Sequence, residues 1–310
     1  MNERIKEVLN VMPENLRCLV GSAVKNISGD IEEIRLRVNR PLIIGTASGN
    51  FAVLSSGNVS PAIGGAYIVN ETDIRRLFCT LCENSVYAHS EEIKQGYITI
   101  RGGHRAGFSG KAVVNDGRIE NIRDINSINI RVASERIGTA SEYKDHIIVN
   151  DCIVNTLVVS PPGCGKTTLL RDIARLISNS GIKVAVVDER GEIAAVYHGT
   201  PQNNIGMQTD VMEDAPKGKA IPMLLRSMSP QVIICDEIAT EEDISAIEKS
   251  FGAGVGVIAS AHAGSLDEIK SRKIFENMWG KGKFEKVIVL KRNNNSLSKM
   301  ITGEVYEVDK

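Results

Sequence analysis

The sequence is poor in aromatic residues and nearly neutral in charge. Only 4% of its 310 residues are Phe, Trp or Tyr, which leaves few side chains on which nucleic-acid bases can stack. Lysine and arginine together number 37, against 38 aspartates and glutamates, for a net charge of -1. Because nucleic-acid-binding proteins commonly present concentrated positive charge, this composition argues against direct binding to nucleic acid.

Long hydrophobic runs and a paired cysteine framework are also missing. No apolar stretch approaches the roughly 20 residues that span a bilayer. The opening MNERIKEVLNVMPENL has the spacing of an amphipathic helix and not of a signal peptide. The one C-x-x-C pair, Cys79 and Cys82, lies on the apolar face of a predicted helix, which favours core packing over a metal or redox pair. We therefore expect a cytoplasmic protein with free thiols.

The chain changes character near its middle. In its first part, segments such as 96–114 alternate apolar and polar residues around glycines, which is typical of antiparallel hairpins. Further on, short apolar strands alternate with helices, the pattern of a mostly parallel, doubly wound α/β sheet. We predict an α+β domain over residues 1–137, a polar linker over 138–146 and a doubly wound α/β domain over 147–310.

The clearest motif is VSPPGCGKTTLL, in which a strand runs into a glycine-containing loop and then a helix. Gly163 and Gly165 permit backbone angles that turn successive N–H groups toward one anion, and the helix N-terminus points the same way. Lys166 is placed to reach the β- and γ-phosphates, and Thr167 to ligate Mg²⁺. The predicted nucleotide-binding residues of the loop are Ser160, Pro161, Pro162, Gly163, Cys164, Gly165, Lys166, Thr167 and Thr168.

The loop departs from the strict phosphate-loop signature at its first position, where Ser160 stands in place of glycine. This position lies at the exit from the strand, where Pro161 and Pro162 stiffen the chain, and a small residue with negative φ fits it. We therefore expect nucleotide binding to survive. The competing interpretation is a glycine-rich turn without a ligand, which the GKTT run between a strand and a helix argues against.

Acidic residues follow two of the apolar strands. In QVIICDE, Asp236 and Glu237 come directly after a buried strand. Since such sheets bind ligands at the carboxyl ends of their strands, Asp236 is suited to Mg²⁺ and Glu237 to polarising the attacking water. In KVAVVDERGE, Asp188 or Glu189 is suited to Mg²⁺ or water, with Arg190 as a salt-bridge partner. The alternative in both cases is an ordinary acidic strand end.

A histidine ends a third strand, in VGVIASAHAGS. A lone histidine is more often structural than functional. His262, however, ends the strand that follows QVIICDE, where a sensor of the γ-phosphate would stand. We therefore predict His262 as a site residue.

Together these motifs resemble those of the secretion ATPases, the hexameric motors of type II and type IV secretion and of type IV pili. MLLRSMSPQVIICDEI and FGAGVGVIASAHAGS follow the family order of an Arg-bearing helix, a Glu-ended strand and a histidine box. The resemblance implies a RecA-like P-loop domain, a homo-hexamer, and ATP with Mg²⁺ as ligands. It places Arg226, Glu237 and His262 in the catalytic set, with Lys166 and, in an acidic box, Glu189.

Within that superfamily the chain looks like a sporulation-specific group, which serves the channel complex between mother cell and forespore in endospore-forming bacteria. The segments that carry this likeness, spread over nearly the whole chain, are EIRLRVNRPL, YITIRGGHRAGFSGKAVV, SINIRVASE, VDERGEI and RSMSPQVIICDEI. It implies a mother-cell ATPase that powers or assembles the channel and reaches the membrane through membrane-protein partners of the complex.

The comparison with the wider family shows two departures. The residue before the catalytic glutamate is usually glycine there, whereas here it is Asp236. The four-cysteine zinc element of many type II motors is missing, because no cysteine follows Cys235, so we expect no zinc.

Arginines of the N-terminal domain often reach the nucleotide in such motors, in many cases that of a neighbouring subunit. The matching candidates here are Arg101, Arg105 and Arg131, and the alternative for each is a solvated or salt-bridged surface arginine.

Two other functions share the P-loop domain. One is a recombinase-type translocase stimulated by single-stranded DNA, which the neutral charge and few aromatics argue against. The other is a non-hydrolysing scaffold that uses ATP only to order its subunits, which the intact Asp236–Glu237 pair argues against.

Overall fold

The computed structural model describes residues 2–292 and 301–308. The chain divides into two compact units, each described here by itself. Unit 1 comprises Met1–Ser134 and Tyr197–Gln202, and unit 2 comprises Glu135–Val196 and Asn203–Lys310.

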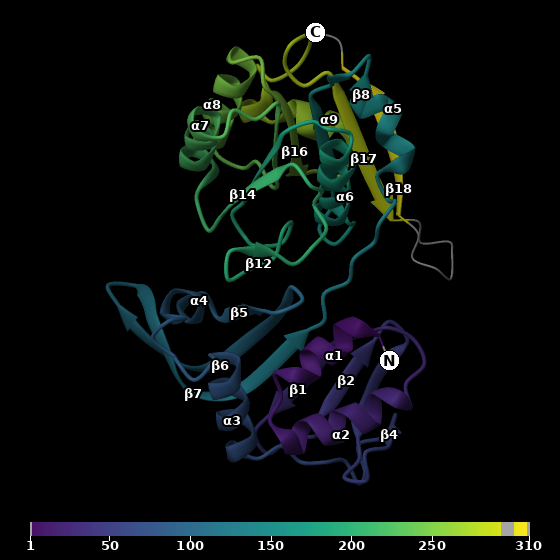
Figure 1. The fold of residues 1–310 in the computed structure, drawn as a ribbon, viewed down its shortest axis with the longest axis vertical. Coiled ribbons are helices and arrows are strands. Elements are labelled where there is room, and N and C mark those ends of the chain that lie inside the picture. Colours follow the sequence, from purple (N-terminus) through teal and green to yellow (C-terminus); the bar gives the residue numbers. More distant parts are fainter. Residues whose placement is uncertain (1, 293–300, 309–310) are drawn as a thin grey trace. The chain divides into compact units, whose positions relative to one another are not determined.

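Unit 1 is an α+β domain built on an antiparallel sheet with strand order β4-β3-β2-β1-β7-β6-β5 (Figure 1). Its strands are β1 (Ile31–Arg37), β2 (Ile43–Thr46), β3 (Gly49–Val53), β4 (Val59–Ser60), β5 (Tyr97–Ile100), β6 (His104–Asn115) and β7 (Arg118–Arg131). Its helices are α1 (Glu3–Asn10), α2 (Glu14–Lys25), α3 (Glu71–Leu81) and α4 (Ser90–Gln95). Alternate strand residues such as Ile34 and Ile130 are buried with the apolar faces of these helices, so the period-2 pattern of the sequence marks one covered face.

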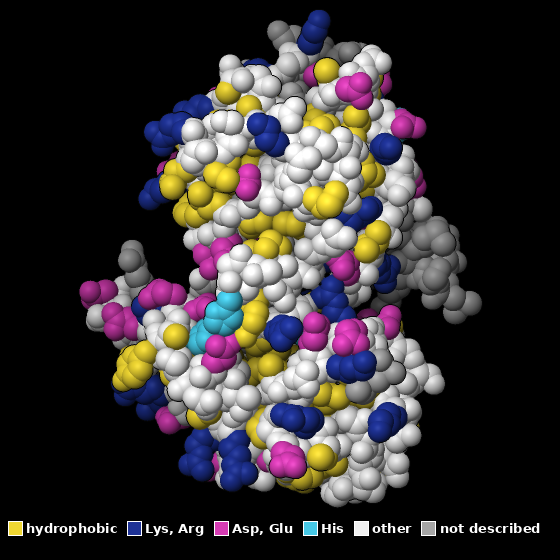
Figure 2. Space-filling model, in the orientation of Figure 1, with side chains coloured by type: hydrophobic (Ala, Val, Ile, Leu, Met, Phe, Trp, Pro, Cys, Tyr) yellow, Lys and Arg dark blue, Asp and Glu magenta, His cyan; other side chains and the backbone are white. Residues whose placement is uncertain are grey.

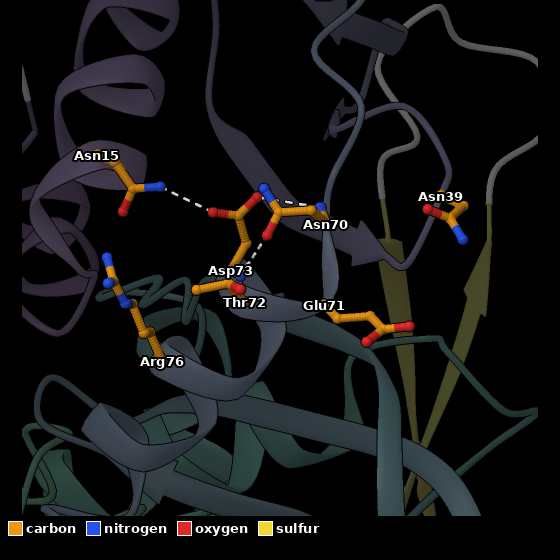
Figure 3. A pocket seen from close by; sticks show the side chains of 7 residues that line it. All are labelled: Asn15, Asn39, Asn70, Glu71, Thr72, Asp73 and Arg76. Atoms are coloured by element: carbon orange, nitrogen blue, oxygen red, sulfur yellow. Dashed lines mark hydrogen bonds between the residues drawn. The ribbon is translucent and has the colours of Figure 1, made fainter.

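The start of α3 shows how side chains join the elements of unit 1 (Figure 3). Asn70 and Asp73 form a capping box, in which each side chain accepts the backbone N–H of the other residue, at 2.9 and 3.1 Å. The Asp73 carboxylate also accepts from the amide of Asn15 on α2 at 2.8 Å and from the Tyr67 hydroxyl at 2.7 Å. Burial and this carboxylate raise the pKa of Tyr67 to about 12. Asp73 therefore ties α2 and the loop before α3 together.

The C-x-x-C pair lies at the other end of α3. Cys82 is buried in the core of unit 1, Cys79 is half-buried, and both are free thiols.

Residues Tyr197–Gln202 belong to unit 1 although the chain on both sides belongs to unit 2. They lie in a hairpin of β12 (Val196–Tyr197) and β13 (Thr200–Pro201). The Tyr197 hydroxyl donates a hydrogen bond to Glu83 Oε1, and His198 Nε2 lies 2.9 Å from the same oxygen. The backbone N–H of Gly102 donates to Gln202 Oε1 at 2.8 Å.

Unit 2 is a doubly wound α/β domain with strand order β14-β11-β15-β16-β10-β17-β18, in which only β18 is antiparallel to its neighbour. Its sheet strands are β10 (Thr156–Ser160), β11 (Val184–Asp188), β14 (Thr209–Glu213), β15 (Val232–Cys235), β16 (Gly256–His262), β17 (Lys286–Arg292) and β18 (Ile301–Glu307). Its longer helices are α6 (Lys166–Asn179), α7 (Lys217–Ser227) and α8 (Glu241–Gly252), and α9 (Leu266–Ser271) is shorter.

Both faces of this sheet are covered, which is why central strands such as β10, β11 and β15 read as apolar runs. Leu157 and Val159 of β10 pack in a cluster with residues of α7 and α8, whereas Val158 between them packs with α6. The predicted fold class, a doubly wound P-loop domain preceded by an α+β domain, is confirmed.

The segment predicted as a linker, 138–146, lies within unit 2. The Ala140 backbone N–H donates to the Asp172 carboxylate at 2.7 Å, and Ala140 and Tyr143 are buried in a core cluster of that unit. α5 (Lys144–Ile147) follows, leading to the short β8 (Ile148–Val149) and β9 (Cys152–Ile153). The division between the units comes earlier, after Ser134, so these polar residues mark a packed surface segment and not a free connection.

Among the described residues, none of the helices combines the length and the apolar character that crossing a bilayer requires.

Candidate active site

The loop between β10 and α6 has the backbone of a phosphate cradle. Gly163 and Gly165 have φ values of 72° and 79°, in the left-handed region that favours glycine. Gly165 stands at the N-cap of α6 and has no side chain with which to cap the helix. The first N–H groups of α6 therefore face the loop as ready donors to an anion.

Lys166, the first residue of α6, is buried against the end of β10. Its Nζ donates to the Ser160 carbonyl at 3.0 Å and lies 3.4 Å from the Ser160 hydroxyl. Burial lowers the pKa of Lys166, opposed by the negative charge of Glu237. The serine that replaces the first glycine of the signature is itself fully buried, and it gives the lysine a partner.

His262 joins the lysine to the predicted catalytic carboxylate. Lys166 Nζ lies 2.8 Å from His262 Nδ1, and His262 Nε2 lies 3.0 Å from Glu237 Oε1. Because an ammonium group only donates, Nδ1 must accept, which leaves the ring proton on Nε2, facing the carboxylate. The other Glu237 oxygen pairs with Arg190. These four side chains form one polar chain across the carboxyl ends of the central strands.

Asp236 is a buried carboxylate with an unused oxygen. Only 4% of the residue is exposed, and within the described part of the chain its Oδ1 has no hydrogen-bond partner. Burial raises the pKa of Asp236 to about 6, with the positive charge of Lys217 acting in the opposite direction. A divalent cation would supply the missing partner and hold the carboxylate ionised, so the residues present fit a Mg²⁺ site, with Thr167 at the start of α6 as the second predicted ligand.

We expect Asp236→Asn to stabilise the ligand-free protein at neutral pH. The pKa of Asp236 is higher in the folded than in the unfolded chain, so the folded state binds the extra proton and loses stability as the pH rises from about 4 to about 6. Asparagine removes this effect. The gain in free energy of unfolding should be near zero at pH 4 and should reach up to about 3 kcal/mol above pH 6. Urea unfolding at several pH values measures it, and an equal effect at pH 4 and pH 8 would contradict the assignment.

Asp188 was predicted as a metal ligand, but in this structure its carboxylate accepts hydrogen bonds from the backbone. Its side chain is fully buried, and its two oxygens accept the backbone N–H groups of Glu192, Ile193 and Ala194 at 2.8 to 3.0 Å. These bonds fold the segment after β11 back onto the strand end. The geometry therefore favours a structural role for Asp188 over the predicted metal role, because its lone pairs already serve backbone donors.

Asp188→Asn tests that role. An amide offers one acceptor where the carboxylate offers two, so at least one buried N–H loses a charge-assisted bond, and we expect a loss of about 2–4 kcal/mol in free energy of unfolding. Urea unfolding measures it, with Asp210→Asn at an exposed position of β14 as the matched control. Unchanged stability together with a large rise in the Mg²⁺ concentration needed for turnover would restore the metal role.

Glu189, the next predicted residue, pairs with Lys217 at the start of α7. Lys217 is buried, which acts to lower its pKa, but the hydrogen bond and charge of Glu189 outweigh burial and raise it. Its positive charge also acts on Asp236. Sequence reasoning missed Lys217 because it belongs to no motif and comes 19 residues before Asp236 in the printed sequence.

The four predicted arginines come from other segments than the residues of this polar chain. Arg226 is exposed in the last turn of α7, where its Nε donates to the Pro222 carbonyl of the same helix at 3.1 Å. Arg101, Arg105 and Arg131 belong to unit 1. Arg105 and Arg131 are register partners on β6 and β7, and the Arg105 guanidinium lies 4.1 Å from the centre of the Tyr97 ring. Their contact with a nucleotide stays a prediction.

Solved structures of other proteins share the fold of this chain. The chain resembles the X-ray structure of the Legionella pneumophila ATPase DotB, with a TM-score of 0.59 and 15% identity over 95% of this chain and 81% of that one. It also resembles the pilus retraction motor PilT with bound ADP, with a TM-score of 0.61 and 13% identity over 94% of this chain and 82% of that one. At such identities the likeness concerns the fold of both units and not the chemistry.

The sequence comparisons are more specific. The chain is 36% identical over 293 residues to stage III sporulation protein AA of Bacillus subtilis (strain 168), covering 93% of this chain and 91% of that protein. The model of the family described as "Sporulation stage III, protein AA" matches residues 2–307. The chain therefore belongs to the stage III sporulation protein AA family.

Proposed function

We propose that this protein is a Mg²⁺-dependent ATP hydrolase. The observation that carries the proposal is the chain of polar contacts from Lys166 through His262 to Glu237, beside a glycine cradle. In addition, Asp236 Oδ1 finds no hydrogen-bond partner in the described ranges 2–292 and 301–308. A loop that only bound phosphate would not need a carboxylate held at this edge. Similarity to proteins whose structures are those of an ATPase and of a motor with bound ADP supports the proposal.

Each side chain has a defined task in this reaction. The N–H groups of the loop and Lys166 bind the phosphates, which requires the lysine to leave His262 and turn toward the ligand. Mg²⁺, when bound near Thr167 and Asp236, would neutralise charge on the β- and γ-phosphates. Glu237 orients the attacking water, and Arg190 and His262 hold its carboxylate in place. His262 is free to sense the γ-phosphate once the lysine has left its Nδ1.

The cellular task we propose follows from the family. Hydrolysis in the mother cell powers or assembles a channel between mother cell and forespore, and the protein works as a homo-hexamer that reaches the membrane through partners. In such an assembly the arginines of unit 1 reach the nucleotide of a neighbouring subunit, and Arg226 belongs to the catalytic set. Figure 2 shows acidic and basic side chains interspersed on the face in view, with no continuous basic surface there that would suit nucleic acid.

The test is the ATPase rate as a function of protein concentration, with the mass of the assembly determined in parallel. A rate per subunit that rises steeply as hexamers form supports a site completed between subunits. Tight ATP binding without turnover would favour the scaffold function, and a rate that rises only with single-stranded DNA would favour the translocase.

A further inference from the structure

Glu237 has an unusual backbone. Its φ is 43°, in the left-handed region that residues with a side chain rarely adopt. Such strain persists only where neighbouring groups hold it. The strand before it, β15, follows regular parallel pairing with β16 up to the pair Cys235 and Ala259. The strained residue therefore lies two residues beyond the last pair of the ladder, after the end of β15.

A single residue of the neighbouring strand holds both amides at this bend. The Ser260 hydroxyl accepts the backbone N–H of Glu237 at 2.9 Å, and the Ser260 carbonyl accepts the N–H of Ile238 at 2.7 Å. Ser260 is 1% exposed and lies in the middle of β16. A buried hydroxyl is unfavourable without a partner, so its presence among the apolar residues of β16 needs a reason, and the Glu237 amide provides one.

The two ends of Glu237 are thus held from different directions. Its carboxylate pairs with Arg190 and His262, while its backbone N–H donates a hydrogen bond to the Ser260 hydroxyl. A general base must stand within hydrogen-bond reach of the water that it activates, and a misplacement of about 1 Å can lower the rate about 100-fold. Holding the backbone therefore decides where the carboxylate stands once Lys166 has turned to the phosphates.

We propose that Ser260 is a positioning residue for ATP hydrolysis, which acts by holding Glu237 in its left-handed conformation through the bond to the Glu237 amide. In this proposal Ser260 acts through Glu237 and not through the reacting atoms. The inference rests on the proposed function. It predicts that the hydroxyl of residue 260 contributes to the catalytic step and not to nucleotide binding.

The experiment compares Ser260→Ala with Ser260→Thr, which restores a hydroxyl, and with Ser250→Ala. Ser250 is an equally buried serine whose hydroxyl bonds to the Ala246 carbonyl within α8, so it controls for the loss of a buried hydroxyl in unit 2. We expect Ser260→Ala to lower kcat about 10- to 100-fold while the Kd for a fluorescent ATP analogue with Mg²⁺ stays within about threefold. Ser260→Thr should recover kcat to within about threefold, and Ser250→Ala should leave it unchanged.

A double variant gives a readout that a merely structural role would not move. In a Glu237→Gln background, Ser260→Ala should lower the residual rate by less than about twofold, because the carboxylate that it positions is already gone. Full additivity, an unchanged kcat for Ser260→Ala, a parallel loss of ATP binding, or a folded Ser260→Thr as slow as the alanine variant would each overturn the inference. If the unaltered protein shows no turnover at all, the proposed function fails and the role of Ser260 falls with it.

Discussion

Lys166→Ala is expected to weaken ATP binding at least about 100-fold and to reduce turnover to background. The ammonium group is the charged donor closest to the glycine cradle on α6, and a charge-assisted bond to phosphate contributes about 1.5–3 kcal/mol. Loss of two such bonds accounts for the expected change. Titration with a fluorescent ATP analogue measures binding, and phosphate release measures turnover.

The same substitution should leave the fold intact. Burial lowers the pKa of Lys166, which means that the buried charge does not itself favour folding, so its removal should keep or slightly raise the free energy of unfolding. Lys183→Ala is the matched control, because Lys183 is exposed just before β11, at the opposite end of the strands from the cradle. Binding equal to that of the unaltered protein would show that the loop is a turn without a ligand.

The elements of unit 2 were predictable from the sequence because local patterns determine them. Buried parallel strands read as apolar runs, and a helix follows the glycine loop as the motif requires. Strand ends were predictable for the same reason, since all parallel strands present their carboxyl ends at one edge. Lys166, Glu237 and His262 therefore meet as the order of the motifs suggests.

The tasks of individual carboxylates were less predictable. Asp188 ends β11 and Asp236 directly follows the neighbouring β15, and the two are the same residue type. The Asp188 carboxylate accepts three backbone N–H groups, whereas Asp236 Oδ1 has no hydrogen-bond partner among the residues that the structure describes. The difference arises from how the chain after β11 folds back, which no local pattern in VDERGEI reveals. Arg190 was predicted as a partner of Asp188 or Glu189, and the structure shows a pair that was not predicted, with Glu237 after the next strand of the sheet.

The prediction of a linker over residues 138–146 rested on the polarity of this segment alone. Short polar residues between two periodic regions indicate a loop, but they say nothing about whether that loop packs. In the structure Asp172 of α6 binds the Ala140 amide, and this contact across a long separation in sequence makes the segment part of unit 2. Such tertiary contacts form only in the folded chain. The sequence therefore predicts the helices, the strands and the sheet edge that holds the site, but it does not predict where each unit begins and ends.

Glu237→Gln is expected to bind ATP within about threefold of the unaltered protein and to lower turnover about 100- to 10,000-fold, the range that a general base contributes. The amide oxygen can still accept from His262 Nε2, so the side chain should keep its place, while the charge that pairs with Arg190 and polarises water is lost. Glu248→Gln, at an exposed position of α8, is the matched control.

Single-turnover measurements separate the two steps for Glu237→Gln. ATP should remain intact on the protein long after the unaltered protein has released phosphate, and any assembly that requires bound ATP should accumulate. Normal turnover by this variant would mean that another group orients the water. The chain from Lys166 through His262 would then serve only to hold the lysine in the absence of ligand, and the strained backbone at 237 would need a different explanation.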